Sequence, residues 1–419
     1  MNLKIQNSKF KIQNLILKIT GSKSETNRLL LLRALYPNLV LENISNSYDS
    51  EVMIKALGAQ YPIPNTQYPK IDVHHAGTAM RFLTAYSAIQ EDYEVHLTGS
   101  SRMKERPIQI LVDALNELGA EITYEEKEGF PPLKIKGKKL TENKVSIQAN
   151  VSSQYISALL LIAPKLENGI EITLEGDITS VSYIKMSLAL LNKIGVETSF
   201  IEKKIIVKPK SVIHNLKFTI ESDWSSASYW YSIIALSEID TQITLSSFKE
   251  NSLQGDFALV EIYKNFGVET VFNTNQMLLR KVENLKPETL NLKLNNSPDI
   301  AQTIAVTCFG LGISCNLTGL HTLKIKETDR LEALRVELTK LGASISVTNH
   351  SLTLGKSENV NTNIRISTYQ DHRMAMAFAP LALKVPIIIE NAEVVSKSYP
   401  DFWEDFKQFG FVLEEKASN

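Results

Sequence analysis

The chain has 419 residues, of which 43% are hydrophobic and 22% are charged, and its formal net charge is −1. One hydrophobic core rarely serves so long a chain, so we expect a globular protein with two domains of about 200 residues each. The near-neutral balance argues against a nucleic-acid-binding protein, which normally carries a basic excess.

The N-terminal segment, residues 1–19, is polar and punctuated by lysines, without the apolar core of a signal peptide. Its KIQN sequence at residues 4–7 recurs at residues 11–14, and we interpret both copies as strand-like segments without a function. No apolar run approaches the roughly 20 residues that span a bilayer. Cys308 and Cys315 lie in an apolar stretch and are expected to be buried free thiols. We therefore expect a reduced, cytoplasmic protein that does not bind membranes.

An amphipathic helix that runs into glycine and then into an alternating strand recurs along the chain. The six glycines, 61, 76, 72, 75 and 68 residues apart, are Gly58, Gly119, Gly195, Gly267, Gly342 and Gly410. Glycine commonly ends a helix because it accepts the left-handed conformation without a steric penalty. Six matches at similar spacing indicate a repeated α/β architecture. Three repeats in each of two domains is the simplest arrangement, and a solenoid remains an alternative.

The copy at residues 107–124 illustrates the pattern. Pro107 suits the first position of a helix, where its missing N–H is no loss. The spacing of Ile108, Leu111, Leu115 and Leu118 predicts one buried stripe, after which Gly119 ends the helix and an alternating strand follows.

Polar and charged residues gather at the expected starts of other helices. In chain order, the segments are Lys23–Arg28, Gly77–Arg81, Ser152–Gln154, Ser180, Ser297–Asp299, Lys326–Arg330 and Asp371–Arg373. Serine, threonine and aspartate there are ordinary helix caps. Cations are disfavoured beside the positive end of a helix dipole unless an anion lies in front of the helix. The sequence therefore predicts binding sites for one or two polyanionic ligands, although each cation alone could be a solvated surface charge.

Three further cations, Arg102, Lys104 and Arg106, occupy alternate positions, so an extended chain would direct all three to one side. The segment around Lys23 is not a Walker loop, because Ser22 and Leu17 stand where that pattern requires glycines. Neither GxGxxG nor a set of metal ligands at suitable spacing occurs. We expect chemistry without a metal or another cofactor.

Taken together, the segments GSKSETNR, AGTAMR, RMKERPI, SSQYISALLL, SVSY, KETDRL, DHRMAMAF and KSYPDFW closely resemble the 5-enolpyruvylshikimate-3-phosphate synthase family. They occur in the family's order and span residues 21–403. The resemblance implies an α/β enolpyruvyl-transferase-like fold of six βαβαββ units, three per domain, with the active site in the interdomain cleft. It also implies one discontinuous domain, residues 1–20 plus 223–419, and a second domain, residues 21–222.

The resemblance implies transfer of the enolpyruvyl group of phosphoenolpyruvate to the 5-hydroxyl of shikimate 3-phosphate by addition and elimination, with release of phosphate, in aromatic amino acid biosynthesis. Both substrates carry a phosphate and a carboxylate, which suits the density of cations. An enol ether carbon becomes electrophilic once the neighbouring methylene is protonated. The site then needs a proton donor for carbon, a base for the hydroxyl and fixed cations. We expect a monomer that binds these two substrates and no nucleic acid.

Residue roles follow from the matching motifs. Asp299 resembles the carboxylate that accepts the hydroxyl proton, and Glu327 resembles the one that exchanges a proton with the methylene; a helix cap and an intrahelical partner of Arg330 are the respective alternatives. The residues that resemble ligands of shikimate 3-phosphate are Lys23, Ser24, Arg28, Ser152, Ser153, Gln154, Ser180 and Lys326, with Tyr183 beside them. The residues that resemble ligands of phosphoenolpyruvate are Gly77, Arg102, Arg330, Arg373 and Lys397, together with Lys23. Arg81 and His372 are candidates for supporting positions.

Three positions depart from the family pattern. His75 stands where the family commonly has asparagine, Phe82 where it has proline, and Thr322 where it has an asparagine that contacts the acceptor. We expect activity to survive with altered substrate affinity. Gly77 is expected to leave room for glyphosate.

Two other functions are alternatives. A related family transfers enolpyruvate to UDP-N-acetylglucosamine, but it typically has a cysteine in the loop that here reads SSRMKERP. A non-catalytic repeat scaffold that binds acidic partners would need only surface cations, which leaves Asp299 and Glu327 unexplained.

Overall fold

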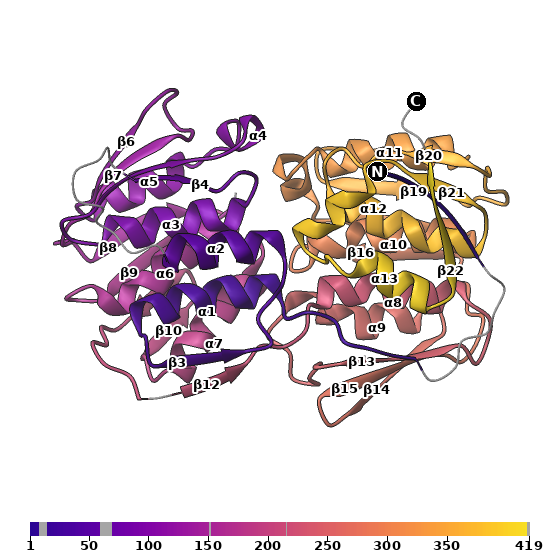
Figure 1. Cartoon of the computed structure of the whole chain (residues 1–419), viewed down its shortest axis with the longest axis horizontal. Coiled ribbons are helices and arrows are strands. Elements are labelled where there is room, and N and C mark those ends of the chain that lie inside the picture. Colours follow the sequence, from indigo (N-terminus) through magenta and orange to yellow (C-terminus); the bar gives the residue numbers. More distant parts are fainter. Residues whose placement is uncertain (8–14, 59–68, 151, 215, 417–419) are drawn as a thin grey trace. The chain divides into compact units, whose positions relative to one another are not determined.

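The computed structural model describes residues 1–7, 15–58, 69–150, 152–214 and 216–416. The chain forms two compact units, which we call unit 1 (Met1–Gly21 with Glu221–Asn419) and unit 2 (Ser22–Ile220) (Figure 1). The expected domains, 1–20 plus 223–419 and 21–222, stay a prediction, and the compact units differ from them at residues 21, 221 and 222. The second KIQN copy lies outside the described residues, whereas residues 4–7 belong to the first strand.

Unit 1 contains three four-stranded sheets within the described residues. The first has the order β20 (Ile364–Ile366), β21 (Ile387–Ile389), β1 (Asn2–Asn7), β22 (Phe411–Lys416). The second has the order β14 (Val268–Asn273), β15 (Gln276–Lys281), β13 (Gln242–Ser246), β2 (Leu15–Leu17). The third has the order β16 (Thr289–Lys293), β17 (Ser314–Thr318), β19 (Ser351–Leu354), β18 (Ile345–Val347).

Unit 2 also contains three sheets in the part that the structure describes. Two are four-stranded: β4 (Lys70–Asp72), β5 (Glu94–Thr98), β7 (Leu133–Lys136), β6 (Glu121–Tyr124), and β10 (Thr198–Ile201), β11 (Lys204–Val207), β9 (Ile170–Glu175), β8 (Lys144–Gln148). The last pairs β12 (Leu216–Thr219) with β3 (Leu39–Glu42).

The five four-stranded sheets share one plan, in which two parallel strands are followed by an antiparallel pair. In the third sheet of unit 1, β16 runs parallel to β17, and β17 and β18 both run antiparallel to β19. The chain there reads β16, α10, β17, α11, β18, β19, which is one βαβαββ repeat. The predicted α/β class and its repetition are confirmed, and in the described part of the chain the sheet of β12 and β3 has two strands.

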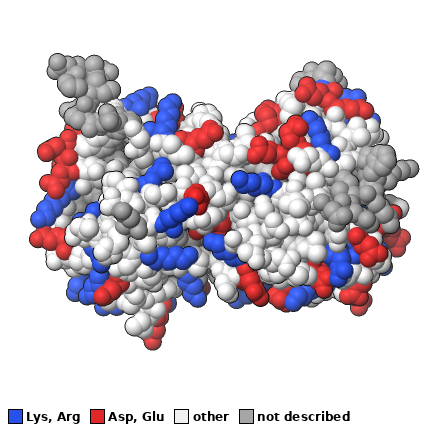
Figure 2. Space-filling view, turned by 60° about the horizontal axis from the view of Figure 1, so that its bottom comes forward, with Lys and Arg blue, Asp and Glu red and all other residues white. Residues whose placement is uncertain are grey.

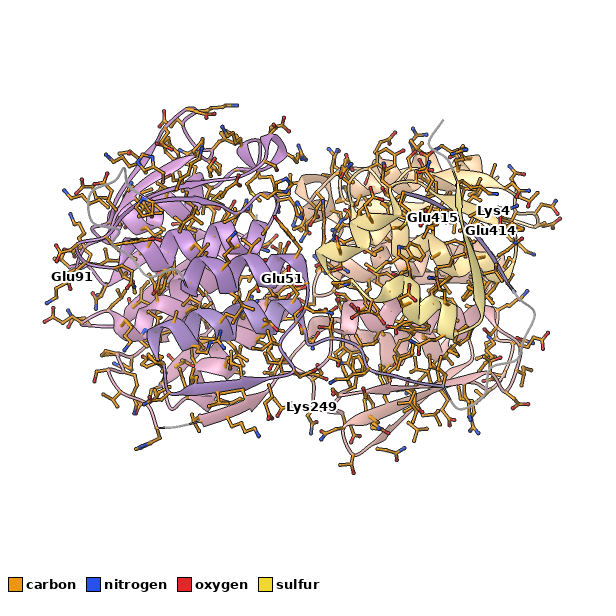
Figure 3. The ribbon with its side chains drawn as sticks, in the orientation of Figure 1. Lys4, Glu51, Glu91, Lys249, Glu414 and Glu415 are labelled. Atoms are coloured by element: carbon orange, nitrogen blue, oxygen red, sulfur yellow. The ribbon has the colours of Figure 1, made fainter. Side chains whose placement is uncertain are left out.

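The first sheet of unit 1 is completed by both ends of the chain. Strand β1 pairs antiparallel with β22, so that Lys4 lies opposite Glu414 and Leu3 opposite Glu415 (Figure 3). Opposite charges on facing strands stabilise such a pair modestly. Figure 2 shows basic and acidic side chains intermixed over the described surface of each unit on the face in view, in agreement with the near-neutral composition.

The helices of unit 1 are α8 (Trp224–Leu236), α9 (Leu259–Lys264), α10 (Ala301–Leu311), α11 (Arg330–Lys340), α12 (His372–Phe378) and α13 (Phe402–Gln408). Its 3-10 turns are η2 (Gly255–Ala258), η3 (Pro298–Ile300), η4 (His321–Ile325), η5 (Ala379–Leu383) and η6 (Ala392–Lys397). Unit 2 has α1 (Lys23–Leu35), α2 (Tyr48–Gly58), α3 (Gly77–Ala88), α4 (Ser101–Lys104), α5 (Gln109–Glu117), α6 (Ser153–Ile162), α7 (Val181–Lys193) and the turn η1 (Ala163–Lys165).

Three buried helices form the centre of each unit. In unit 1, α8, α10 and α12 pack against one another, and in unit 2, α1, α3 and α6 do so. A helix that is apolar on all sides belongs in a core, and Leu159, Leu160 and Leu161 of α6 are all fully buried. Cys308 and Cys315 are buried free cysteines, as predicted. The sheets thus surround a helical core whose helix starts carry the charged motifs.

The structure shows the conformations of the six repeated glycines and of the copy at residues 107–124. All but one of the six glycines have a positive φ; Gly58 instead is the last residue of α2. Ile108, Leu111, Leu115 and Leu118 are buried, as the spacing predicts. The position predicted for Pro107 is wrong, because α5 begins at Gln109 with Ile108 as its N-cap.

Candidate functional site

The starts of the three core helices of unit 1 are joined by one side chain. Arg373, the second residue of α12, donates from Nη1 to the carbonyl of Asp299, just before α10, over 3.2 Å. Its Nη2 donates to the hydroxyl of Ser225, the second residue of α8, over 3.2 Å. The Asp371 carboxylate caps α12 by accepting from the Arg373 N–H over 2.8 Å. Three segments far apart in sequence therefore meet around one guanidinium.

Arg330 pairs with three carboxylates. Its Nε donates to Asp371 Oδ2 over 2.7 Å, its Nη1 to Asp299 Oδ1 over 2.8 Å and its Nη2 to Glu327 Oε2 over 2.7 Å. The guanidinium is almost fully buried, where the planar fork of arginine suits several carboxylates at once. Burial lowers the pKa of Arg330, but the three carboxylates outweigh it and leave the pKa above its ordinary value.

Asp299 is surrounded by three cations. Besides Arg330, the Nζ of Lys326 lies 3.6 Å from its Oδ1 and the Nη2 of Arg373 lies 3.6 Å from its Oδ2. Burial alone would raise the pKa of Asp299, but Lys326, Arg373 and Arg330 together hold it well below its usual range. Burial in turn lowers the pKa of Lys326, against the attraction of Asp299. The structure thus brings three predicted site residues, Lys326, Arg330 and Arg373, within direct reach of the Asp299 carboxylate, while Glu327 pairs with Nη2 of Arg330.

Lys397 also contacts the start of α12, through a backbone carbonyl rather than a carboxylate. Its Nζ donates to the carbonyl of Gln370 over 2.6 Å, and Gln370 directly precedes Asp371. Both Tyr369 and Gln370 have a positive φ, which turns the chain sharply into α12. Lys397, Arg330 and Arg373 are therefore all held by the segment that begins α12.

In unit 2, the predicted residues at the start of α1 divide between two environments. Lys23, the first residue of α1, has its Nζ 3.4 Å from Asp49 Oδ2 of α2, and both side chains are partly exposed. Ser24 is half-buried, and its carbonyl accepts from Arg28 Nη1 over 2.8 Å. Lys23 therefore lies at the surface of unit 2, whereas Arg28 points into it.

Arg28 is almost completely buried among neutral groups. Its Nε donates to Ser187 over 2.8 Å and its Nη2 to Ser157 over 2.9 Å. The guanidinium also lies over the rings of Phe82 and Tyr183, at 5.5 and 5.6 Å from their centroids. Burial lowers the pKa of Arg28 to about 10, although Tyr183 and Glu25 counteract it. The predicted contact between Arg28 and a substrate stays a prediction, since this side chain is bound inside the unit.

The starts of α3 and α6 meet beside Gly77. The Gln154 amide of α6 donates to the Thr78 hydroxyl of α3 over 3.1 Å. A Cβ added to Gly77 would lie 2.4 Å from Nη1 of Arg106, so the guanidinium packs directly on this glycine. Ser152 caps α6 by accepting from the Gln154 N–H over 3.3 Å.

The remaining predicted serines of unit 2 also stand at helix starts. Ser153, the first residue of α6, is buried. Ser180, the N-cap of α7, is buried too and adopts a left-handed conformation with a φ of 53°. A non-glycine residue at positive φ is uncommon and marks a locally imposed conformation.

The extended conformation considered for residues 101–106 is wrong. Residues Ser101–Lys104 form α4, with Ser100 as its N-cap, so the three cations do not point to one side. Arg102 is exposed and its Nη1 pairs with Glu105 Oε2 over 2.9 Å, while Lys104 pairs with Glu126. Local capping by serine favours one helical turn over the extended form. The structure therefore places Arg106, rather than Arg102, on Gly77.

The three residues that depart from the family pattern, His75, Phe82 and Thr322, each lie against neighbouring groups. The His75 ring stacks on Tyr48 with a centroid distance of 4.8 Å, and its Nδ1 lies 2.5 Å from Nδ1 of His74. Phe82 is fully buried and lies under the guanidinium of Arg28. Thr322 is buried in η4, which packs against η3.

Of the supporting candidates, Arg81 donates from Nη2 to the carbonyl of Pro107 over 3.0 Å and from Nη1 to the carbonyl of Gly77 over 3.1 Å. His372 is buried at the start of α12. Arg81 thus contacts the backbone at the start of α3, and His372 is the first residue of α12.

Sequence reasoning missed Ser225, Asp256 and the part that Asp49 plays beside Lys23. Asp256 lies in η2 and accepts a hydrogen bond from the Ser225 hydroxyl. The sequence offered only a weak signal for this pair, since a serine inside a helix start and an isolated aspartate are both common. Within the described residues, no group of histidine, cysteine and carboxylate side chains could hold a metal ion, and none of the helices there is long and apolar enough to cross a membrane.

Comparison with known proteins gives consistent results. The family described as EPSP synthase (3-phosphoshikimate 1-carboxyvinyltransferase) matches residues 9–406. A 3-phosphoshikimate 1-carboxyvinyltransferase from Bacteroides fragilis (strain YCH46) is 45% identical over 407 residues, which cover 95% of this chain and 96% of the relative. One from Haemophilus influenzae (strain KW20 / Rd) is 34% identical, covering 94% and 95%.

Two solved structures have the same fold. EPSP synthase from Acinetobacter baumannii aligns with a TM-score of 0.77 at 18% identity, over 99% of this chain and 100% of that one. The enolpyruvyl transferase NikO from Streptomyces tendae aligns with a TM-score of 0.73 at 13% identity, over 100% and 99%.

Proposed function

The chain belongs to the EPSP synthase family, and we propose that the residues gathered at its helix starts carry out that family's reaction. The chain transfers the enolpyruvyl group of phosphoenolpyruvate to the 5-hydroxyl of shikimate 3-phosphate and releases phosphate, a step of aromatic amino acid biosynthesis. The observation that carries the assignment of roles is the set of hydrogen bonds from Arg330 to Asp299, Glu327 and Asp371.

Asp299 is the proposed base for the 5-hydroxyl. The three cations around it keep the carboxylate ionised, and they also make it a weak base. A bound phosphoenolpyruvate would bring its own negative charges to Arg330 and Arg373, and so would offset part of the field that lowers the pKa of Asp299. We infer that Asp299 becomes a stronger base when the anionic substrate is present.

Glu327 is the proposed donor to the methylene carbon. Its Oε2 accepts from Arg330, and its side chain is more exposed than those of Asp299 and Asp371. A carboxyl group at the accessible edge of a cationic cluster can exchange protons with a substrate, whereas the fully buried Asp371 serves to orient Arg330. Glu327 and Asp371 thus have separate roles beside Arg330.

The cations supply binding and electrostatic stabilisation. The proposed ligands of phosphoenolpyruvate are Lys23, Gly77, Arg102, Arg330, Arg373 and Lys397. Fixed cations also stabilise the negative charge that develops on the departing phosphate. Ser24, Arg28, Ser152, Ser153, Gln154, Ser180 and Lys326 are the proposed ligands of shikimate 3-phosphate. We further propose that the protein is cytoplasmic and monomeric. Light scattering on the purified chain tests the monomeric state.

A phosphate-release assay tests the function. The purified chain is incubated with phosphoenolpyruvate and shikimate 3-phosphate, with phosphoenolpyruvate and UDP-N-acetylglucosamine, or with phosphoenolpyruvate alone, each with and without a chelator. Release only with shikimate 3-phosphate is the expected result. Release with the nucleotide sugar, or no release in any arm, would contradict the proposal, and loss of activity on chelation would show that a metal is required.

A further inference from the structure

Asp256 is a buried carboxylate that the roles assigned above do not use. It lies in η2, between β13 and α9, and only 5% of the residue is exposed. The hydroxyl of Ser225 in α8 donates to its Oδ2. Burial raises the pKa of Asp256 to about 7; repulsion from Asp299 and Asp223 acts in the same direction, while Arg373 opposes it.

Ser225 connects this carboxylate to the proposed site. Its Oγ accepts a hydrogen bond from Nη2 of Arg373 over 3.2 Å. A serine hydroxyl has a single hydrogen, which here is directed to Asp256 while the lone pairs face the guanidinium. Arg373 therefore donates to Ser225, and Ser225 in turn donates to Asp256, in one continuous series of hydrogen bonds.

Ser225 holds Arg373 at Nη2, the nitrogen that also lies 3.6 Å from Oδ2 of Asp299. Nη1 of Arg373 is held by the carbonyl of Asp299 over 3.2 Å, and Nη2 is held by Ser225. A guanidinium recognises a carboxylate through two parallel N–H bonds, so its orientation decides whether the fork can close on its ligand. A displaced fork would still carry its charge but would bind the anion less well.

We propose that Asp256 is a positioning residue, which acts through Ser225 to orient the guanidinium of Arg373 for an anionic substrate. The proposal rests on the function proposed above, because it takes Arg373 as a ligand of phosphoenolpyruvate. It assigns no direct substrate contact to Asp256 or to Ser225.

Variants of Ser225 and of Asp256, the two residues behind Arg373, test the proposal. Ser225→Ala and Asp256→Leu should each raise the KM for phosphoenolpyruvate about tenfold, the range expected when a hydrogen bond to a charged group is lost. The KM for shikimate 3-phosphate should change less than about twofold. The double variant should be no worse than either single variant, because both cut the same connection. Ser225→Thr keeps the hydroxyl and should restore the wild-type KM.

Two matched controls measure the cost of removing similar groups elsewhere. Asp405→Leu removes another buried carboxylate, which accepts from Tyr399 over 2.5 Å, and Ser237→Ala removes a serine at the opposite end of α8. Both should leave the KM for phosphoenolpyruvate unchanged. Thermal melting of every variant separates lost folding from lost binding, and Ser225→Ala with Ser225→Thr suffices if Asp256→Leu does not fold.

The outcomes distinguish the positioning role of Asp256 from the proposed function of the chain. An unchanged KM for phosphoenolpyruvate in Ser225→Ala or in folded Asp256→Leu, or an equal rise in the KM values for both substrates, would overturn the positioning role. The same holds if Ser225→Thr behaves like Ser225→Ala. Absence of turnover in the wild-type chain would instead contradict the proposed function.

Discussion

The Nη1 of Arg330 donates to Oδ1 of Asp299 over 2.8 Å and so joins the start of α11 to the segment that leads into α10. The proposed base and a proposed substrate ligand are therefore partners in one buried ion pair. An anion bound by Arg330 has to share the guanidinium with Asp299, which couples substrate binding to the basicity of the carboxylate.

The burial of this ion pair predicts a large effect on stability. Arg330→Met would leave Asp299 and Asp371 buried without their main cation, so the free energy of unfolding should fall by about 3–5 kcal/mol. The matched control is Arg335→Met on the same helix, where the arginine is exposed and pairs with Glu332. That control should cost less than about 0.5 kcal/mol. Equal losses in urea unfolding near neutral pH would contradict the prediction.

Replacement of the proposed base should affect the rate more than binding. Asp299→Asn is expected to lower kcat by about 10²- to 10⁴-fold, the usual contribution of a general base. Because the surrounding cations hold the pKa of Asp299 in the ligand-free chain well below its usual range, the wild-type kcat/KM should show no acid limb from this residue at mildly acidic pH. Steady-state kinetics over a range of pH provides the measurement, with Glu332→Gln as a surface control. A variant with wild-type kcat would exclude Asp299 as the base.

The buried guanidinium of Arg28 predicts a structural cost for a conservative change. Arg28→Lys keeps the charge but cannot reach Ser157, Ser187 and the Ser24 carbonyl together, so stability should fall by about 1–3 kcal/mol. Arg33→Lys, in the last turn of the same helix, is the control. If both variants melt at the wild-type temperature, the hydrogen bonds of Arg28 contribute nothing measurable.

The contact between Gly77 and Arg106 predicts the effect of adding one methyl group. In Gly77→Ala the new Cβ would lie 2.4 Å from Nη1 of Arg106 and would displace the guanidinium. We expect a higher KM for phosphoenolpyruvate, weaker inhibition by glyphosate than in the wild type, and little change in kcat. Gly58→Ala is the control, since a Cβ there meets nothing within 4 Å. The glyphosate part fails if millimolar inhibitor leaves wild-type turnover unchanged at low phosphoenolpyruvate.

The raised pKa of Asp256 predicts a pH-dependent stability difference. Burial, with repulsion from Asp299 and Asp223, raises the pKa to about 7, so the folded chain binds this proton more tightly than the unfolded chain does. The resulting stabilisation is complete below the ordinary aspartate pKa of about 3.9, declines as the pH rises, and is lost above about pH 7. Asp256→Asn lacks this contribution, so the wild type should lose stability relative to it across that window.

Asp405→Asn provides the comparison for this measurement. Burial raises the pKa of Asp405 to about 6, so the corresponding decline should end about one pH unit lower. Parallel stability curves for the wild type and Asp256→Asn in urea unfolding would show that Asp256 titrates normally.

Local sequence rules determined much of the fold. The glycines at 119, 195, 267, 342 and 410 end helices or their turns at positive φ, because glycine alone adopts that conformation without cost. Polar residues such as Ser22, Asp223 and Asp371 cap helices for an equally local reason. The positions of Lys326, Arg330 and Arg373 at expected helix starts also indicated that they belong to an anion-binding site.

Tertiary structure decided which charges meet. Nothing near Arg28 in the sequence shows that its guanidinium points inward to Ser157 and Ser187, 129 and 159 residues away. Likewise Arg330 finds Asp371 across 41 residues, and Ser225 finds Asp256 across 31. The sequence by itself therefore determined many of the helix ends and which helices carry charge, although it misplaced the start of α5 and did not indicate α4. Only the packing of distant helices decided which charges are buried as pairs, because burial and pairing depend on neighbours that no local pattern specifies.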